Sequence, residues 1–396
     1  MPYRPSSTIC RFFHASATTT FILTFSMLSS ATSQASAGDG ACQPTLLGSF
    51  NTPNVASGVT AVGSTAYVTD EAFGLLIFDV SDPATPVLLG SYNTPGQAFD
   101  IAVVGDTAFV ADGFSGLQII DVSNPAVPTL LSSYDTPGFA QAFGVTVIGG
   151  TAYVADAGSG LQIVDVSDPA TPILLGTYNT PDFANGVTVV GDTAYVADGT
   201  SGLQIIDVSD PAMPTLLGSY DTPSWAFGVT VVDGTAYVAN GGSGLHIIDV
   251  SNPATPVLLG TYNTPSFAYD LTVVGSTAYV ADGPSGLQII DVSDPAMPTL
   301  LASYNTPGHA WDVSVVNDTA YVADATSGLQ IIDASDCLDE PCPADLTGDG
   351  VLNFFDISAF LQAFANNDPL ADFTNDGIWN FFDISAFLQL FAAGCP

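Results

Sequence analysis

Basic side chains are almost absent from this sequence. Its 396 residues include two Lys or Arg, Arg4 and Arg11, against 39 Asp or Glu, which gives a formal net charge of −37 at pH 7. A field of this sign repels nucleic acid and anionic lipid, and it favours divalent cations, basic partners or a saline medium. A solvated surface that serves only solubility is the alternative explanation. The lack of lysine excludes Schiff-base catalysis and a lysine general base.

Long apolar runs are also missing. The stretch Phe21–Leu28 is too short to span a bilayer, and no later segment qualifies. Arg4 and Arg11 precede it and Ala35-Ser36-Ala37 follows it, a pattern typical of a secretory signal with a small-residue cleavage site. We therefore predict a signal peptide at residues 1–37, whose cleavage removes both basic residues. The protein is expected to be secreted or associated with the cell surface, with no membrane span and no nucleic-acid partner.

Cysteine is scarce, with five copies in the chain. Cleavage after Ala37 leaves four of them, and four cysteines in an exported chain most simply form two disulfides. They are Cys42, Cys337, Cys342 and Cys395.

What the sequence does contain is a repeat of 42 residues. An Asp between two apolar residues marks the period, with one step of 44, at Asp79, Asp121, Asp165, Asp207, Asp249, Asp291 and Asp333. Each unit holds four short β-rich runs separated by turn residues, as at residues 86–92, 100–104, 107–111 and 116–122. Seven such units predict an all-β fold, a seven-bladed β-propeller.

The two ends of the array predict how the ring closes. The array begins on a run like a fourth strand, residues 44–50, and it ends after a third strand, residues 328–334. The first segment is therefore expected to supply the missing outer strand of the last blade by strand exchange, which removes an open sheet edge. The same alignment places Cys42 and Cys337 at neighbouring positions of one connection, within the span that a disulfide needs.

The recurring strings Leu-x-Ile-Ile-Asp-Val-Ser-Asp-Pro-Ala and Thr-Ala-Tyr-Val-Ala-Asp resemble the bacterial LVIVP-type propeller repeat over residues 44–335. The resemblance implies a fold and an extracytoplasmic location, but no reaction. We assign the propeller to residues 38–336 and a linker to residues 337–343.

A variable pair of positions flanks a recurrent alanine before the first strand of each repeat. The last three repeats carry aromatic or imidazole side chains there, namely Trp225, Phe227, Phe267, Tyr269, His309 and Trp311. Residues two apart in an extended chain point the same way. The recurrent hairpin Asp residues, such as Asp112, are usually turn-capping residues, and they are expected on the same rim as the rings. Rings beside carboxylates can bind a glycan or a peptide. The alternative is that the rings pack between the blades as core.

The last fifty-odd residues contain two copies of another motif. Residues 345–356 and 372–383 each have the oxygen-bearing residues and the sixth-position glycine of a twelve-residue Ca²⁺ loop. An amphipathic helix is predicted after each loop from apolar residues at helical spacing. These residues are Ile357, Phe360, Leu361 and Phe364 after the first loop, and Ile384, Phe387, Leu388 and Phe391 after the second.

This duplicated unit resembles a dockerin module, which we assign to residues 344–396. The resemblance implies two bound Ca²⁺ ions and docking onto a cohesin-like or surface receptor. By position, the ligands of one ion would be Asp345, Thr347, Asp349, Val351, Asn353 and Asp356, and those of the other Asp372, Thr374, Asp376, Ile378, Asn380 and Asp383. The docking residues would be Phe354, Phe355, Phe381 and Phe382, unless these rings form the core of the module. Cys342 and Cys395 bracket the module and are expected to pair.

The sequence favours a secreted, non-enzymatic interaction protein with a binding face on the propeller and a Ca²⁺-dependent docking module. The alternative is a glycan-degrading enzyme, a hydrolase or a lyase, because dockerins commonly occur on such enzymes. Paired glutamates do not stand out as a general acid and base, since Glu71 and Glu340 are the only two. Signal cleavage leaves His246 and His309 as imidazole bases, and His246 replaces a Gln of the other repeats.

Overall fold

The computed structural model describes the propeller and part of the C-terminal module. The described residues are 42–136, 140–337, 344, 346–347, 352, 354–366, 368–374 and 377–393. The predicted signal peptide at residues 1–37 lies outside them, and so do Cys342 and Cys395 with the disulfide predicted between them.

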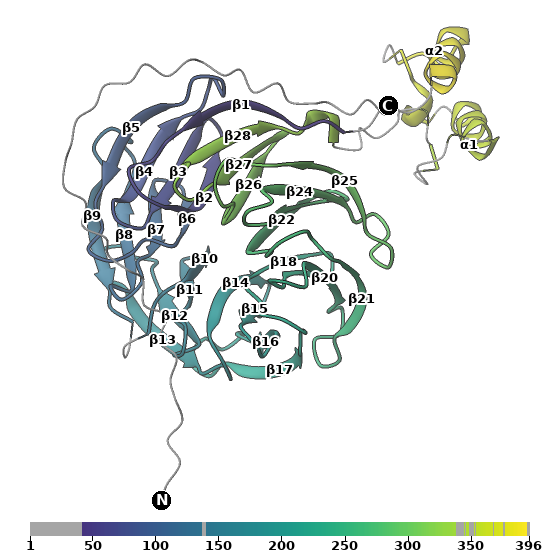
Figure 1. The fold of residues 1–396 in the computed structure, drawn as a ribbon. Helices are drawn as coiled ribbons and strands as arrows, with labels where there is room; N and C mark the ends of the chain where they lie inside the picture. Colours follow the sequence, from purple (N-terminus) through teal and green to yellow (C-terminus); the bar gives the residue numbers. More distant parts are fainter. Residues whose placement is uncertain are drawn as a thin grey trace, which may run out of the picture. The chain divides into compact units, whose positions relative to one another are not determined.

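Seven four-stranded antiparallel sheets form the main part of the described chain (Figure 1). The first strand of each sheet contacts the first strands of both neighbouring sheets, and the series of contacts returns from the seventh sheet to the first. The sheets are therefore the blades of a closed ring, which confirms the predicted seven-bladed all-β propeller.

The first and second strands of each blade come from the variable segment and from the Thr-Ala-Tyr-Val-Ala string. The first strands are β2 (Ala56–Val62), β6 (Asp100–Val104), β10 (Gly144–Ile148), β14 (Ala184–Val190), β18 (Gly228–Val232), β22 (Asp270–Val274) and β26 (Asp312–Val316). The second strands are β3 (Thr65–Asp70), β7 (Thr107–Ala111), β11 (Thr151–Ala155), β15 (Thr193–Asp198), β19 (Thr235–Ala239), β23 (Thr277–Ala281) and β27 (Thr319–Ala323).

The third and outer strands complete each blade. The third strands are β4 (Gly74–Asp79), β8 (Leu117–Asp121), β12 (Leu161–Asp165), β16 (Leu203–Asp207), β20 (Leu245–Asp249), β24 (Leu287–Asp291) and β28 (Leu329–Asp333). The outer strands are β5 (Val87–Tyr92), β9 (Thr129–Tyr134), β13 (Ile173–Tyr178), β17 (Thr215–Tyr220), β21 (Val257–Tyr262), β25 (Thr299–Tyr304) and β1 (Thr45–Phe50).

The hydrophobic core lies between neighbouring blades. In β11, Val154 packs with Phe109 and Ile119 of the preceding blade, whereas Tyr153 on the opposite face packs with Val196 of the next blade. Both faces of the middle strands are buried, so these strands are almost wholly apolar and do not alternate with polar residues. The outer strands are more exposed, and in β13 the consecutive residues Ile173 and Leu174 both face solvent.

Close contact between blades also requires small residues on the outer strand. In β5 the pairing with β4 shifts by one residue beside Gly90, as in a β-bulge. A Cβ atom on Gly90 would lie 2.3 Å from the carbonyl oxygen of Pro125 in the next blade. Glycine is therefore needed there because the neighbouring backbone occupies the space of a side chain.

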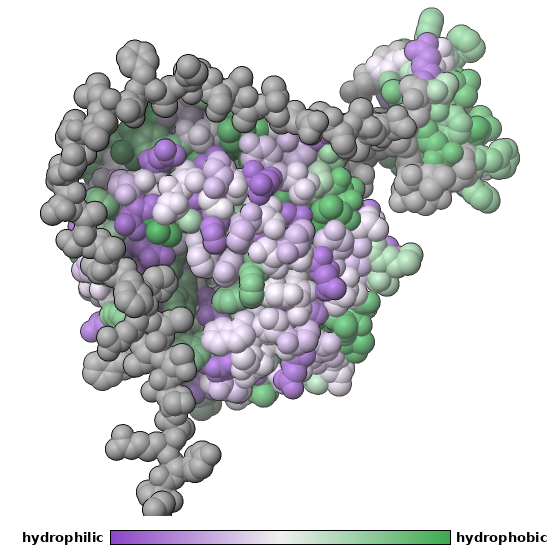
Figure 2. All heavy atoms as spheres, viewed as in Figure 1, coloured by the Kyte–Doolittle hydropathy of each residue, from purple (hydrophilic) through white to green (hydrophobic). Residues whose placement is uncertain are grey.

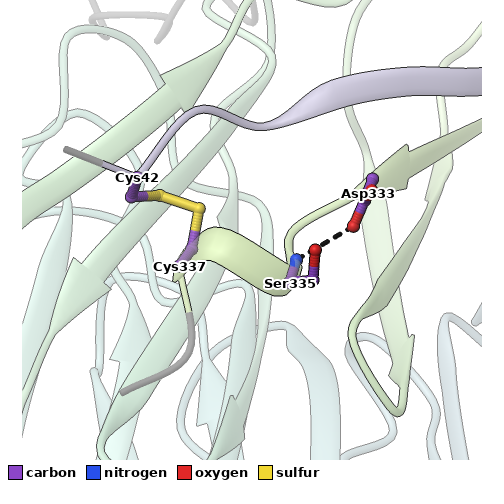
Figure 3. Close-up of a disulfide and its surroundings, with 4 residues drawn as sticks. All are labelled: Cys42, Asp333, Ser335 and Cys337. Atoms are coloured by element: carbon purple, nitrogen blue, oxygen red, sulfur yellow. Dashed lines mark hydrogen bonds between the residues drawn. A yellow bond between two sulfur atoms is a disulfide. The ribbon is translucent and has the colours of Figure 1, made fainter. Parts of the chain in front are cut away.

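The ring closes by strand exchange, as predicted. Strand β1 pairs antiparallel with β28, and Thr45 lies opposite Asp333. The short helix η1 (Ser335–Cys337) follows β28 and carries Cys337 to Cys42, with which it forms the predicted disulfide at a Cα–Cα distance of 4.5 Å (Figure 3). The Ser335 amide donates to Asp333 Oδ1 at 3.0 Å and caps the turn between the strand and η1.

The described part of the C-terminal region contains α1 (Phe354–Ala365), η2 (Pro369–Ala371) and α2 (Phe381–Ala393). Both α-helices were expected after the two Ca²⁺ loops. No helix of the described residues is long and apolar enough to cross a membrane.

The disulfide leads to a first prediction, the effect of replacing Cys42 and Cys337 together by alanine. The bond joins residues 295 positions apart, so its loss frees a very long loop in the unfolded chain. We expect the free energy of unfolding of the propeller to fall by about 2–5 kcal/mol, measured by urea unfolding.

Wild-type protein in a strong reductant is the matched control and should unfold like the double variant. If neither the variant nor the reductant changes the unfolding midpoint, the disulfide does not contribute to the closure of the ring.

Candidate functional site

The hairpin carboxylates that were expected beside the aromatic rings are buried and already bonded. Thr136 Oγ1 donates to Asp156 Oδ1 at 2.9 Å, and Thr306 Oγ1 donates to Asp324 Oδ1 at 2.6 Å. Each threonine follows the outer strand of the preceding blade, and both carboxylates are fully buried. The expectation that they face a ligand is therefore wrong, because they hold the connection between blades.

The segment that enters each first strand is anchored by its alanine. All seven of these alanines are fully buried, and the backbones of six pair with the hairpin of the preceding blade, as where the Ala226 amide donates to the Gly199 carbonyl at 2.9 Å. The residue after the alanine lines a central cavity in every blade. These residues are Ser57, Phe99, Phe143, Asn185, Phe227, Tyr269 and Trp311.

The cavity has a volume of about 640 Å³. Residues of all seven blades line it, so it lies on the central axis of the propeller. Further along the first strands, Thr146, Thr188 and Thr230 contribute to its wall. This size is within the range of small-ligand sites.

Five aromatic rings from four consecutive blades form a continuous series at this cavity, which we call the aromatic arc. They are Phe183, Trp225, Phe227, Tyr269 and Trp311. Ring centroids are 6.3 Å apart for Phe183 and Trp225, 5.2 Å for Phe227 and Tyr269, and 4.2 Å for Tyr269 and Trp311. The arc therefore offers a curved apolar wall for stacking.

Four of the six predicted face residues belong to the aromatic arc. Trp225 is 42% exposed, and none of the six is part of the hydrophobic clusters between blades, although rings of neighbouring blades contact one another in the arc. The other two are exposed but do not line the cavity. Phe267 lies 6.4 Å from Tyr269, and His309 is on the surface of the last blade.

Three carboxylates in the cavity were missed by the sequence analysis. The position after each cavity-lining residue is Gly in four blades and Asp in the other three. Asp100, Asp270 and Asp312 occupy it and line the cavity. The sequence did contain a signal for these carboxylates. A site in a repeat protein requires differences between the repeats, and the alternation between glycine and aspartate is such a difference.

Backbone amides hold two of these carboxylates in place. Asp100 accepts hydrogen bonds from the Ile101 amide at 2.7 Å and, across the blade boundary, from the Val145 amide at 2.8 Å. Asp312 accepts from the Val313 and Val59 amides, both at 2.6 Å.

The third carboxyl group, Asp270, is hydrogen-bonded to Asp312. Asp270 and Asp100 are partly accessible, whereas Asp312 is 9% exposed.

Burial raises the pKa values of all three groups. It raises the pKa of Asp100 to about 7, with a further contribution from the charge of Asp312, and it raises the pKa of Asp270 well above its ordinary value. Asp270 is therefore the protonated member of its pair and donates to Asp312. No Lys or Arg lies in the described residues, so no permanent cation compensates these carboxylates there.

His246 does not supply a base for the cavity. It is buried in the fifth blade, where its Nδ1 lies 3.0 Å from the Asn240 side-chain nitrogen. Burial lowers its pKa to about 4, so the ring is neutral at physiological pH. The structure therefore supports its interpretation as a variant of the repeat.

The described residues of the two predicted Ca²⁺ loops have matching geometry. The Thr374 amide and hydroxyl donate to Asp383 Oδ1 at 3.0 and 2.8 Å. In the other loop, Thr347 donates to Asp356 Oδ1 at 3.1 and 2.7 Å. Positions 3 and 12 of each loop are thus side by side, as a closed coordination loop requires.

The sixth position also fits a Ca²⁺ loop. Gly377 has a φ angle of +74°, and its amide donates to Asp372 Oδ2 at 2.8 Å. Ile378, whose carbonyl would be a ligand, accepts from the Asn380 side chain at 2.9 Å. The remaining predicted ligands Asp345, Asp349, Val351, Asn353 and Asp376 lie outside the described residues. Within those described, no three His, Cys, Asp or Glu side chains gather as a metal site.

The core of the C-terminal module is aromatic. Phe360 and Phe387 stack in parallel with centroids 4.1 Å apart. The predicted docking rings are not in this core, and their exposed fractions are 74% for Phe354, 68% for Phe355, 73% for Phe381 and 68% for Phe382. Leu361 and Leu388, which the helical spacing assigned to the apolar faces, are also exposed. The visible surface of these helices is accordingly mostly hydrophobic (Figure 2).

Comparison with known families identifies the repeat. A family model described as the LVIVD repeat matches residues 55–94, 95–136, 140–180, 183–222, 225–264, 267–306 and 307–337. The description LVIVD replaces the LVIVP label of the sequence analysis. None of the curated proteins compared with the chain matches it.

Solved structures share the fold at low identity. The computationally designed Ika8 protein is 7% identical over 73% of this chain and 99% of its own, with a TM-score of 0.57. The WD40 β-propeller domain of Doa1 is 11% identical over 74% and 97%, with a TM-score of 0.62. A chain of the mitotic checkpoint complex is 12% identical over 79% and 98%, with a TM-score of 0.62. These similarities concern the fold alone.

The raised pKa of Asp100 predicts a pH dependence of stability. The folded chain keeps a proton on Asp100 up to about pH 7, whereas the unfolded chain releases it near pH 4. The contribution of Asp100 to stability therefore falls as the pH rises through this window. The Asp100→Gly variant carries the residue found in four other blades. As the pH rises through this window, we expect its free energy of unfolding to fall less than that of the wild type, by on the order of a few kcal/mol.

Urea unfolding of both proteins at several pH values from 4 to 8 measures this difference. The control is Asp106→Asn, an exposed side chain in the turn that follows the same strand, which should follow the wild-type curve. Parallel curves for wild type and Asp100→Gly would show that Asp100 titrates normally.

Proposed function

The chain belongs to the LVIVD repeat family, and we propose from this premise that it is a secreted, non-enzymatic interaction protein. Its propeller would bind a glycan or a peptide in the central cavity. The observation that supports this most is the aromatic arc, which places five rings, each in contact with the next, at a cavity to which all seven blades contribute. Flat apolar rings beside hydrogen-bonding groups are suited to stacking a sugar or an extended peptide.

We also propose that the C-terminal module is dockerin-like and attaches the propeller to a cohesin-like or surface receptor. Two observations support this. The described loop residues have hydrogen bonds and a glycine conformation that suit Ca²⁺ binding, and the four phenylalanines near the helix starts are exposed in matching pairs. When bound, Ca²⁺ would neutralise the loop carboxylates and fix the starts of both helices.

The carboxyl pair in the cavity is the one feature that favours the enzymatic alternative. Glycoside hydrolases need two carboxyl groups about 5–5.5 Å apart for retention and about 6.5–9.5 Å apart for inversion. Asp270 and Asp312 are hydrogen-bonded to each other, which is closer than either arrangement. His246 is neutral and buried away from the cavity. The binding function is therefore the better supported of the two.

The binding proposal is tested with Trp225→Ala. Because Trp225 is 42% exposed and outside the core clusters, we expect unchanged thermal unfolding but at least about tenfold weaker binding of any glycan or peptide retained by the wild type. Calorimetric titration with a panel of soluble polysaccharides and capped peptides measures the affinity.

Met213→Ala is the control, since Met213 is 70% exposed but lies on an outer loop. Equal affinity of the Trp225→Ala variant and the wild type would exclude the aromatic arc as the contact surface. A large loss of thermal stability would instead make the arc structural.

The docking proposal predicts that chelation erases the helical circular-dichroism signal of the full chain and leaves the β signal of the propeller unchanged. A module of about fifty residues buries too little core to fold without its ions. We expect two Ca²⁺ per wild-type chain and one for Asp383→Ala. Asp368→Ala, which changes a helix cap outside the loops, should keep both. Helices that persist in excess chelator would contradict the proposal.

A further inference from the structure

The central cavity has an electrostatic property that a generic sugar or peptide site does not need. Besides the aromatic arc, it holds the side chains of Asp100, Asp270, Asp312 and Glu71. No described Lys or Arg faces them, and the whole chain carries a net charge of −37. Aromatic faces and carboxylates both attract cations, and the attraction grows where water is partly excluded.

The spacing of the carboxylates favours an organic cation over a metal ion. No three acidic side chains of the described residues come together at metal-binding spacing. Asp270 and Asp312 form one pair, whereas Asp100 lies on the second blade, with the first blade between it and Asp312. Polar threonines and aromatic rings occupy the rest of the wall. Carboxylates distributed in this way suit a charged group at the end of an apolar stem.

We propose that the ligand of the central cavity presents a lysine side chain, whose ammonium group meets the Asp270–Asp312 pair, with Asp100 across the cavity, while its methylene stem packs on the aromatic arc. This inference rests on the proposed function of the cavity as a binding site and names the chemistry of the ligand.

The existing hydrogen bonds make lysine a better fit than arginine. Each oxygen of Asp100 and of Asp312 already accepts one backbone amide, so neither carboxylate offers two free oxygens to a planar guanidinium. An ammonium group needs single acceptors in several directions, which the remaining lone pairs provide. The four-carbon stem is apolar and narrow enough to pass between rings.

Binding of a cation would be coupled to proton release. The titratable groups that line the cavity are Asp100, Asp270, Asp312, Glu71 and Tyr269. Burial raises the pKa of each carboxyl group, and a bound ammonium group lowers it again by favouring the charged form. Tyr269 stays protonated, since burial raises its pKa as well. Affinity should therefore increase as the pH rises from about 6 to 8.

The experiment titrates the full chain with an acetylated, amidated tetralysine peptide, by calorimetry at pH 6 and pH 8. About 0.5 M NaCl suppresses non-specific attraction to the acidic surface. The test variant is Asp100→Gly, Asp270→Gly and Asp312→Gly combined, which introduces the residue of the other four blades. The matched control removes the same number of charges at exposed hairpin tips of equivalent first strands, with Asp106→Asn, Asp192→Asn and Asp318→Asn.

We expect the test variant to bind at least about tenfold more weakly at pH 8 and to lose the pH dependence, while the control binds like the wild type. Equal binding by both variants, or no binding by the wild type, would overturn the proposal. A glucosamine tetramer tests whether the amine belongs to a glycan and not to a peptide. If the protein binds this tetramer but not tetralysine, the proposal of a peptide ligand is wrong. If the wild type binds only neutral ligands and Trp225→Ala weakens that binding, the proposed binding function is supported and the inference of a lysine ligand is wrong.

Discussion

The fold depends on burying both faces of each blade against its neighbours. A single four-stranded sheet of this chain has apolar side chains on both sides of its two middle strands, such as Val154 and Tyr153 of β11, and it cannot cover either side alone. Each blade therefore needs two partners, and only a closed ring gives every blade two. This explains why closure is secured by both the pairing of β1 with β28 and the disulfide between Cys42 and Cys337. An open ring would leave two apolar faces in water.

Closure also creates the site. Because the seven first strands surround one axis, seven equivalent positions come together there that are far apart along the chain. In four blades that position is glycine, and at Gly58, Gly144 and Gly186 a Cβ atom would lie 2.6–2.7 Å from a backbone carbonyl of the next blade. A change at one copy is enough to alter the lining, since the core clusters lie between the blades. A symmetric scaffold can thus carry an asymmetric site, although a side chain at Gly58, Gly144 or Gly186 would require the backbone of the next blade to shift.

The sequence predicts those features that each repeat specifies locally. The strands, the number of blades, the exchanged strand and the Cys42–Cys337 bond all follow from turn residues and from the alignment of one repeat on another, and the structure confirms them. The burial of the hairpin carboxylates could not be predicted in this way, because the threonines that donate hydrogen bonds to them belong to the preceding blade. The alternation of glycine and aspartate marks Asp100 as unusual in the sequence, but that its side chain lines the cavity follows only from the closed ring. Helical spacing alone also could not show that Leu361 is exposed.

The two kinds of side chain in the cavity are not distributed evenly around the axis. The aromatic arc runs from the fourth to the seventh blade, whereas the carboxylates occur on the sixth, seventh, first and second blades. They overlap only where Tyr269 and Trp311 stand beside Asp270 and Asp312. A ligand centred on the axis would use neither wall fully, so the favourable position is displaced toward the sixth and seventh blades. There an apolar stem can contact rings while its polar end meets the carboxyl pair. Sequence differences between the repeats thus make the cavity lining asymmetric, although the seven blades share one backbone fold.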